Sequence, residues 1–343
     1  MFPNNLNEHL KPTHFNPAHA HRPDTIAQPL YVICPIYNPM RYRARWKLYL
    51  DFENYVLSNN EAHLVTIECA YGERAFALSK HPSDKHTLIQ VRTKDDLWLK
   101  ENMINIAISR LPADWKYACY IDGDVQFARP DWVGETLHLL QRYSFLQMFS
   151  QVQDLGPNYE VLNQYYSYVY CHHNQENVPQ MNGNRYYTTT GKKGFGYWHP
   201  GFTLAFTRDA LNSVGGLIDW GILGGGDTFM MYCLTGMLDH RTMPDCLGEH
   251  GMRWLKEWQN RCDQHIKRNI GYMDGTILHH WHGSRRDRSY DDRGYILTKA
   301  KFDPEVDIKK DSQGLWQLSG NNIYLRDGIR KYMSKRNEDG IEV

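Results

Sequence analysis

The chain has 343 residues, enough for one large domain or two modest ones with a substantial core. Its 39 Lys and Arg residues balance its 39 Asp and Glu residues, so net charge does not draw the whole protein to nucleic acid or to a membrane surface. No apolar run approaches the roughly 20 residues of a membrane-spanning helix. The N-terminus has no basic segment followed by an apolar one. We therefore expect a cytoplasmic protein without a signal peptide or membrane span.

Short apolar strands alternate with helices from residue 29 onward, after a Pro-, Asn- and His-rich segment (1–28) that predicts an extended arm. The expected strands are 30–34, 64–69, 87–91, 117–121 and 145–149, and the expected helices are 41–57, 97–111 and 130–142. This alternation predicts an α/β fold with a mostly parallel sheet flanked by helices. In such sheets, ligands bind beyond the carboxyl ends of the strands.

The pattern changes after residue 151. Residues 174–196 are rich in Gly, Asn and Thr and lack periodicity, which predicts a long loop. We expect this loop to be a lid that closes over a bound ligand, although an ordinary surface loop would have the same composition. A strand at 202–206, a turn rich in Gly and several helices follow, the last of them in a C-terminal extension (291–343).

An acidic pair, Asp122-Gly123-Asp124, directly follows the expected strand 117–121. Carboxylate oxygens are the hard ligands that Mg²⁺ and Mn²⁺ prefer. Two Asp residues separated by one small residue, where a buried strand opens into a loop, can present both carboxylates to one ion. An ordinary turn is the alternative, because Asp-Gly is common turn chemistry.

Two later motifs carry further candidates. Three glycines precede Asp227, which opens an expected helix (228–234) and is either its N-cap or a carboxylate that takes a proton from a hydroxyl group. The run from His279 to His282 holds three histidines, and neutral imidazole is a good metal ligand. An isolated cluster of this kind is otherwise a polar strand.

The order of these motifs resembles that of the GT-A fold glycosyltransferases, which use nucleotide sugars. The resemblance covers residues 29–290 and includes a Pro-x-Tyr-Asn turn after the first strand, a Lys-Glu-Asn helix before the acidic pair, a GGxD-type turn and a late His-Gly. The segment from Phe302 resembles uncharacterised glycosyltransferase-like proteins of bacteria and phages. The resemblance implies a GT-A domain at 29–290 with the helical extension 291–343 packed on it, in the host cytoplasm if the protein is encoded by a phage.

The resemblance also implies residue roles. Asp122 and Asp124 match the metal-binding pair, His282 matches the late metal-binding histidine, and His280 is the competing candidate. Asp227 matches the catalytic base of inverting members, many of which carry an acidic residue where this chain has Gly226. The residues that match the nucleotide-sugar site are Pro35, Tyr37, Asn38, Glu68, Lys100, Asn102, Asn105, Asp122, Trp198 and Gly201.

The expected activity is transfer of a sugar from a nucleoside diphosphate donor, UDP by resemblance, with Mn²⁺ or Mg²⁺ and with inversion. The acceptor is a hydroxyl group of a glycan or small molecule, or of hydroxymethylated DNA as in a phage-type enzyme. A basic face would serve DNA, and its candidate residues are Arg41, Arg43, Arg45, Lys47, Lys192, Lys193, Arg285, Arg286 and Arg288. Alternatives of another class are a nucleotidyltransferase, which normally has a Gly-rich basic loop after the first strand, and a non-catalytic carbohydrate-binding protein.

Overall fold

The computed structural model describes residues 28–175, 198–238, 247–284, 286–288, 292–320 and 322–342. The expected arm (1–28) and the expected lid (174–196) lie almost wholly outside these ranges. Every helix within them is too short or too polar to span a membrane.

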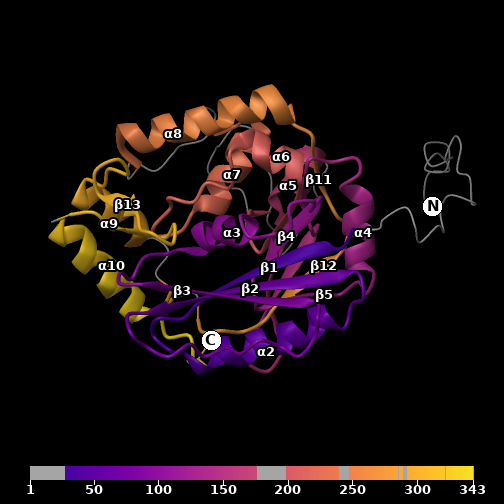
Figure 1. The fold of residues 1–343 in the computed structure, drawn as a ribbon, viewed down its shortest axis with the longest axis horizontal. Coiled ribbons are helices and arrows are strands. Elements are labelled where there is room, and N and C mark those ends of the chain that lie inside the picture. Colours follow the sequence, from indigo (N-terminus) through magenta and orange to yellow (C-terminus); the bar gives the residue numbers. More distant parts are fainter. Residues whose placement is uncertain are drawn as a thin grey trace, which may run out of the picture.

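A seven-stranded sheet forms the centre of the molecule, in the order β11-β6-β10-β4-β1-β2-β3 (Figure 1). Its strands are β1 (Leu30–Tyr37), β2 (Ala62–Tyr71), β3 (His86–Thr93), β4 (Tyr117–Ile121), β6 (Phe145–Gln147), β10 (Thr203–Thr207) and β11 (Ile270–Tyr272). The four strands from β4 to β3 run parallel, whereas β10 is antiparallel to both β4 and β6. The predicted α/β fold with a largely parallel sheet flanked by helices is confirmed.

Helices cover both faces of this sheet, which explains why its central strands are almost continuously apolar. Alternate residues of β1 belong to two different clusters, because successive side chains of a strand point to opposite faces. Val32 packs with helix α2 (Arg43–Leu57), and Ile33 packs with helix α3 (Lys100–Ile108). In Figure 1, α2 and α3 accordingly lie on opposite sides of the sheet. Other helices among the described residues before position 270 are α4 (Trp132–Leu139), α5 (Tyr168–Asn174), α6 (Arg208–Val214), α7 (Gly226–Thr235), α8 (Gly248–Arg261) and the π-helix η5 (Cys262–Ile266).

A second sheet, ordered β5-β12-β7-β8-β9, brings the acidic pair to the histidine run. Its strands are β5 (Val125–Phe127), β7 (Gln151–Leu155), β8 (Val161–Ser167), β9 (Trp198–His199) and β12 (Thr276–His279). In the ladder, His279 lies opposite Val125 of β5 on one side and opposite Asp154 of β7 on the other. Since Val125 directly follows Asp124, this register places an acidic residue on either side of His279.

The C-terminal segment packs back against helix α2. It comprises α9 (Asp292–Ala300), the β13–β14 hairpin (Ile308–Lys310 and Trp316–Leu318) and α10 (Ile323–Lys335). The first amide groups of a helix need acceptors from outside the helix, and no side chain of the preceding residue caps α2. Asp339 supplies both acceptors, 3.0 Å from the amide nitrogen of Arg43 and 2.8 Å from that of Ala44. The tail therefore caps a helix almost 300 residues away.

A buried polar network links α2 to β2 and β3. The amide group of His81 donates to Nδ1 of His86 (2.9 Å), and Nε2 of His86 lies 3.1 Å from the Thr66 hydroxyl. Tyr49 donates to Glu53 and also contacts Thr66. Because Nδ1 of His86 accepts a hydrogen bond, the network holds the neutral imidazole. Burial, aided by nearby positive charge, lowers the pKa of His86 to about 4.

We expect His86 to make the folded chain less stable as the pH is lowered. The unfolded chain binds a proton at His86 below a pKa near 6.5, whereas the folded chain does so only near 4. Between these two pKa values the unfolded state holds a proton that the folded state lacks. The free energy of unfolding should therefore fall by about 3 kcal/mol as the pH is lowered from above the unfolded pKa to the folded one. Chemical denaturation of the unmodified chain and of His86→Gln at several pH values measures this, with the variant losing less. The exposed His138→Gln is the control, and equal pH dependence in all three proteins would contradict the prediction.

Candidate functional site

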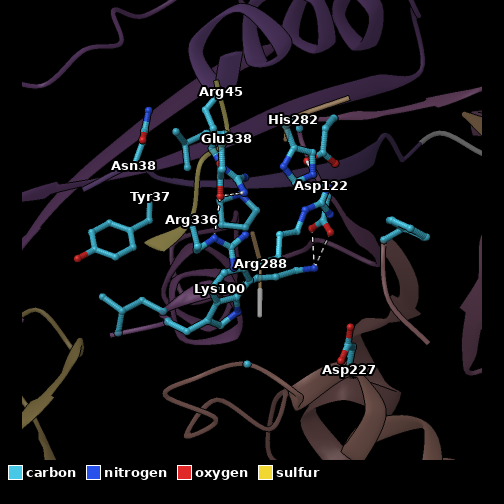
Figure 2. A pocket seen from close by; sticks show the side chains of 18 of the residues that line it. Tyr37, Asn38, Arg45, Lys100, Asp122, Asp227, His282, Arg288, Arg336 and Glu338 are labelled. Carbon is cyan, nitrogen blue, oxygen red and sulfur yellow. Dashed lines mark hydrogen bonds and ion pairs between the residues drawn. The ribbon is translucent and has the colours of Figure 1, made fainter. Parts of the chain in front are cut away.

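A cavity of about 830 Å³ opens at the carboxyl ends of β1 and β4 (Figure 2). Several parts of the chain line it: the turn after β1, the first half of α2, the start of α3, the acidic loop after β4, the loop before β10, the start of α7, the end of β12 with the loop that follows it, and the C-terminal segment. The lining residues used below are Pro35, Tyr37, Asn38, Arg45, Lys100, Glu101, Asp122, Asp124, Asp227, His279, His282, Arg288, Arg293, Arg336 and Glu338.

Asp124, His279 and His282 form a buried cluster in the wall of this cavity, with one ligand atom of each within 4.8 Å of the others. Nε2 of His282 lies 3.2 Å from Oδ2 of Asp124, and Nε2 of His279 lies 3.8 Å from Oδ1. The two Nε2 atoms are 3.1 Å apart. Two imidazole nitrogens and a carboxylate therefore converge on one point.

The surroundings of this cluster suit a metal ion. Nδ1 of His279 lies 2.9 Å from Oδ1 of Asp154, and such a carboxylate fixes the tautomer that leaves Nε2 free to bind. Burial, together with the charges of Arg288 and Arg45, lowers the pKa of His282 well below its usual value, so its imidazole is neutral. Oδ1 of Asp124 is buried and accepts no hydrogen bond from the described residues. A buried carboxylate oxygen without a donor is costly unless a cation satisfies it.

Asp122 faces a different partner from Asp124. Nζ of Lys100, at the start of α3, lies 2.5 Å from Oδ1 and 2.8 Å from Oδ2 of Asp122. The same ammonium group lies 5.0 Å from the centre of the Tyr120 ring. Burial raises the pKa of Asp122, while the Lys100 charge opposes that rise. Lys100 thus fixes Asp122 at the cavity wall, and the structure groups only Asp124 of the acidic pair directly with the histidines.

Asp227 opens α7 and lines the cavity at the same time. Its Oδ1 accepts the amide proton of the next residue, Thr228 (2.7 Å). The N-cap of α7 is Gly225 and no side chain caps the helix, so the alternative prediction of Asp227 as the N-cap is wrong. Its Oδ2 lies against Gly201, where a Cβ atom would overlap with it. Position 201 therefore requires glycine, because the Asp227 carboxylate occupies the space of a side chain there. Gly226 has a similar reason, since a Cβ at that position would lie 3.0 Å from the carboxyl carbon of Glu101.

Arginine side chains gather on the wall that the C-terminal segment provides. Glu338 accepts hydrogen bonds from Arg45 of α2 and from Arg336 (2.8 Å). Burial alone would raise the pKa of Glu338, but the charges of these two guanidinium groups outweigh it and lower the pKa to about 2. Arg336 and Arg293 both donate to the hydroxyl of Tyr332, at 3.1 and 2.8 Å. Figure 2 shows Arg45, Arg336 and Arg288 grouped apart from Asp227.

Besides Lys100 and Asp122, the predicted nucleotide site contributes Pro35, Tyr37 and Asn38 to the lining of the cavity. The hydroxyl of Tyr37 donates to the carbonyl of Asp95 (3.0 Å), so the ring is held in place from behind. The amide side chain of Asn38 bonds both the amide and the carbonyl groups of Tyr42, which fixes the turn after β1. Their contact with a nucleotide stays a prediction.

Four other predicted residues use their polar atoms or rings to hold the fold together. The carboxylate of Glu68 accepts the amide protons of Ala77 and Leu78 and a proton of the Gln90 side chain. The remaining three bind segments distant in sequence: Asn102 bonds Gly314 and Trp316, Asn105 bonds Leu217, and Trp198 packs edge-on against Tyr168. The predicted contact of these four residues with a nucleotide sugar stays a prediction.

The histidines of the run from His279 to His282 do not all face the same side of β12. Ile277 and His279 share the buried face of β12, whereas the next side chain, that of His280, lies 3.3 Å from Gln126 and faces Tyr159. Sequence reasoning singled out His282 and His280 and passed over His279. The period of two along Thr276–His279 is the signal that could have found it. Asp154, Glu338 and Glu101 carried no comparable local signal.

The supposed basic face is only partly present. Arg45 is directed toward Glu338 and Arg288 is buried, so both belong to the cavity. Arg41, Arg43 and Lys47 are exposed near the start of α2. Lys192, Lys193 and Arg285 lie outside the described residues.

We expect Glu338→Gln to lower the free energy of unfolding by about 3 kcal/mol, because removing one partner leaves buried charge uncompensated. Here the uncompensated charges are those of Arg45 and Arg336. Thermal and chemical denaturation measure this, and the exposed Glu342→Gln is the matched control. A variant as stable as the control would contradict the prediction.

No protein-family model and no curated protein matches the chain. Among solved structures, it is similar to residues 1–349 of S. aureus TarS in complex with UDP-GlcNAc, at 10% identity, 90% coverage of this chain, 72% of that chain and a TM-score of 0.42. It is also similar to the Pyrobaculum calidifontis mannosyltransferase PcManGT in complex with GDP-Man and Mn²⁺, at 11% identity, 90% and 70% coverage and a TM-score of 0.40.

A third similar structure is glucosyl-3-phosphoglycerate synthase from Mycobacterium tuberculosis with Mn²⁺, UDP-glucose and phosphoglyceric acid, at 9% identity, 85% and 87% coverage and a TM-score of 0.35. These likenesses concern the fold alone, and residue roles must come from the site itself. Several structural neighbours of this chain are thus GT-A nucleotide-sugar glycosyltransferases, and another is 4-diphosphocytidyl-2C-methyl-D-erythritol synthase from Anaerococcus prevotii, at 9% identity and 72% coverage of this chain.

Proposed function

We propose that this chain is a metal-dependent glycosyltransferase. It transfers a sugar from a nucleoside diphosphate donor, which we expect to be a UDP-sugar, to an acceptor hydroxyl group with inversion. The observation that carries the proposal is the buried cluster of Asp124, His279 and His282, beside Asp122 in a cavity that also contains Asp227.

Asp124, His279 and His282 would hold the ion. Carboxylate oxygen together with imidazole nitrogen favours Mn²⁺ over Mg²⁺, which prefers oxygen ligands and retained waters. When bound, such an ion offsets the charge that develops on a departing diphosphate. Asp154 orients His279, and Lys100 keeps Asp122 at the cavity wall.

The cationic wall suits the anionic donor. Arg288 and Arg336 line the same cavity as the histidines and would hydrogen-bond phosphate oxygens, because a guanidinium group matches phosphate geometry with paired donors. Tyr37 and Asn38 would contact the nucleoside at the turn after β1. Binding on this side orients the anomeric carbon toward Asp227.

Asp227 would act as the general base. As the acceptor oxygen bonds to the anomeric carbon, the bond from that carbon to the diphosphate breaks, and the hydroxyl proton passes to the Asp227 carboxylate. One direct displacement inverts the configuration. The small residue at Gly201 leaves space for this carboxylate beside the loop before β10.

Release of nucleoside diphosphate from a panel of UDP- and GDP-sugars with Mn²⁺ tests the function directly. We expect Mn²⁺-dependent release that EDTA abolishes. Binding without turnover would favour a carbohydrate-binding protein, and pyrophosphate release from a nucleoside triphosphate and a sugar phosphate would favour a nucleotidyltransferase. Either result, or no binding at all, would overturn the proposal.

The metal site makes a separate prediction. Asp154→Asn should weaken Mn²⁺ binding roughly 10- to 100-fold, as loss of an orienting partner does. Asp124→Asn, His279→Ala and His282→Ala should each weaken it at least as much, because each removes a ligand. Titration calorimetry with Mn²⁺ measures this, and His280→Ala is the control. A loss in His280→Ala equal to that in His282→Ala would contradict the assignment.

The assignment of Asp227 as the general base can be tested by substitution. Asp227→Asn should lower the turnover number about 10²- to 10⁴-fold while leaving donor affinity near that of the unmodified chain. Gly201→Ala should also lower turnover, because its Cβ displaces the Asp227 carboxylate. Gly320→Ala is the control, since a Cβ there meets open space. Full turnover by Asp227→Asn would contradict the assignment of Asp227 as the base.

A further inference from the structure

Glu101 is a buried acid that the mechanism above does not use. It is in the first turn of α3, next to Lys100, and lines the same cavity as Asp122 and Asp227. Only 3% of its surface is exposed. Burying an acidic side chain is costly, and packing alone would be served as well by an apolar side chain of similar length.

The carboxyl group of Glu101 lies at the start of α7. Its carboxyl carbon is 3.0 Å from the position that a Cβ on Gly226 would take, and Asp227 is the next residue. A backbone carbonyl, that of Ile218, lies equally close to that position. The absence of a side chain at Gly226 thus admits Glu101, and two acids from different helices share one end of the cavity.

This end of the cavity is acidic. Lys100 is near three carboxyl groups, those of Asp122, Glu101 and Asp227, and its ammonium group is already paired with Asp122. Arg336 lies away from Asp227 in Figure 2. The guanidinium group of Arg293 lies closer, against Gly224 in the turn before α7. Three carboxyl groups thus share this end with one ammonium and one guanidinium group, which leaves carboxyl hydrogen-bonding capacity for neutral hydroxyl groups.

The protonation of Glu101 supports the same ligand class. Burial raises its pKa to about 7; the Lys100 charge opposes that rise and the Asp227 charge adds to it. At neutral pH a large share of the molecules therefore carry a protonated Glu101, which both donates and accepts a hydrogen bond. A hydroxyl group also does both.

We propose that Glu101 binds a hydroxyl group of the acceptor, and that the acceptor is a neutral, hydroxyl-rich molecule such as a sugar. Asp227 takes the proton of the reacting hydroxyl group, and Glu101 holds a neighbouring one. This inference rests on the proposed function and selects among its acceptors: it favours a sugar or polyol over hydroxymethylated DNA, whose backbone is anionic.

The test compares three variants in the full chain. Glu101→Met keeps the length of the side chain and removes its hydrogen bonds, Glu101→Gln keeps both size and hydrogen bonds, and Glu53→Gln changes a buried acid of α2 that bonds Tyr49. The probes are methyl glucoside, galactoside, mannoside and xyloside, each with UDP and Mn²⁺. Saturation-transfer NMR measures sugar binding, and calorimetry measures UDP binding in the same samples.

We expect at least one glycoside to bind the unmodified chain, and Glu101→Met to weaken it about tenfold or more. Glu101→Gln should retain most of the binding, Glu53→Gln should match the unmodified chain, and thermal denaturation should show Glu101→Met at least as stable as its parent. A structural role for Glu101 predicts instead a destabilised Glu101→Met with unchanged sugar affinity, and that result would overturn the inference.

Two further outcomes separate this inference from the proposed function. If no glycoside binds but a hydroxymethylcytosine oligonucleotide accepts sugar from the donor, the function stands and the inference fails. If UDP and Mn²⁺ do not bind the unmodified chain, the proposed function fails, and the inference fails with it.

Discussion

The position of β4 determines where the chemistry of this chain can occur. The chain builds β1, β2 and β3 outward in one direction and then places β4 on the other side of β1, so the strand order reverses between β1 and β4. Beyond the carboxyl ends of strands at such a reversal, helices and loops diverge and leave a crevice. The backbone amide of Asp122 donates to the carbonyl of Phe202 (2.9 Å), which fixes the acidic loop at this crevice. From there β5 pairs with β12 and brings His279 to Asp124.

The C-terminal segment is part of the same crevice rather than a covering over it. Glu338 joins Arg45 to Arg336, and Asp339 caps α2, so the tail is attached to the helix that packs under β1. A buried group of ion pairs is weak evidence for stability, but Glu338 can bond both guanidinium groups in only one arrangement of these side chains. That geometry holds the guanidinium group of Arg336 at the cavity wall. Attachment of the tail and the charge of the cavity wall therefore depend on the same contacts.

Local patterns in the sequence predicted the strand and helix alternation and the acidic pair, because continuous apolar runs and a strand-terminal Asp-Gly-Asp are visible within a few residues. Helix ends were less certain: the helix expected at 97–111 is Lys100–Ile108. The pairing of Glu338 with Arg45 joins residues 293 positions apart, and no local pattern announces it. The sequence analysis weighed only His282 and His280, because the place of His279 depends on which face of a short strand is buried. The hydrogen bond from the amide group of Trp316 to Asn102 joins α3 to β14, and no local pattern predicts it.

Two kinds of construction meet in this cavity. The side with the histidines is built from charged and imidazole side chains that contact one another, and Asp154 orients one of them, His279. The side near α7 is built from missing side chains, because Gly201 and Gly226 let the carboxyl groups of Asp227 and Glu101 approach the backbone closely. Close packing against backbone fixes a carboxyl group without neutralising it. An acid held in this way stays available to a ligand, whereas one held by an ion pair, such as Asp122, is already engaged. The glycines thus explain how two carboxyl groups can be buried at this end of the cavity without a direct ion pair like that of Asp122.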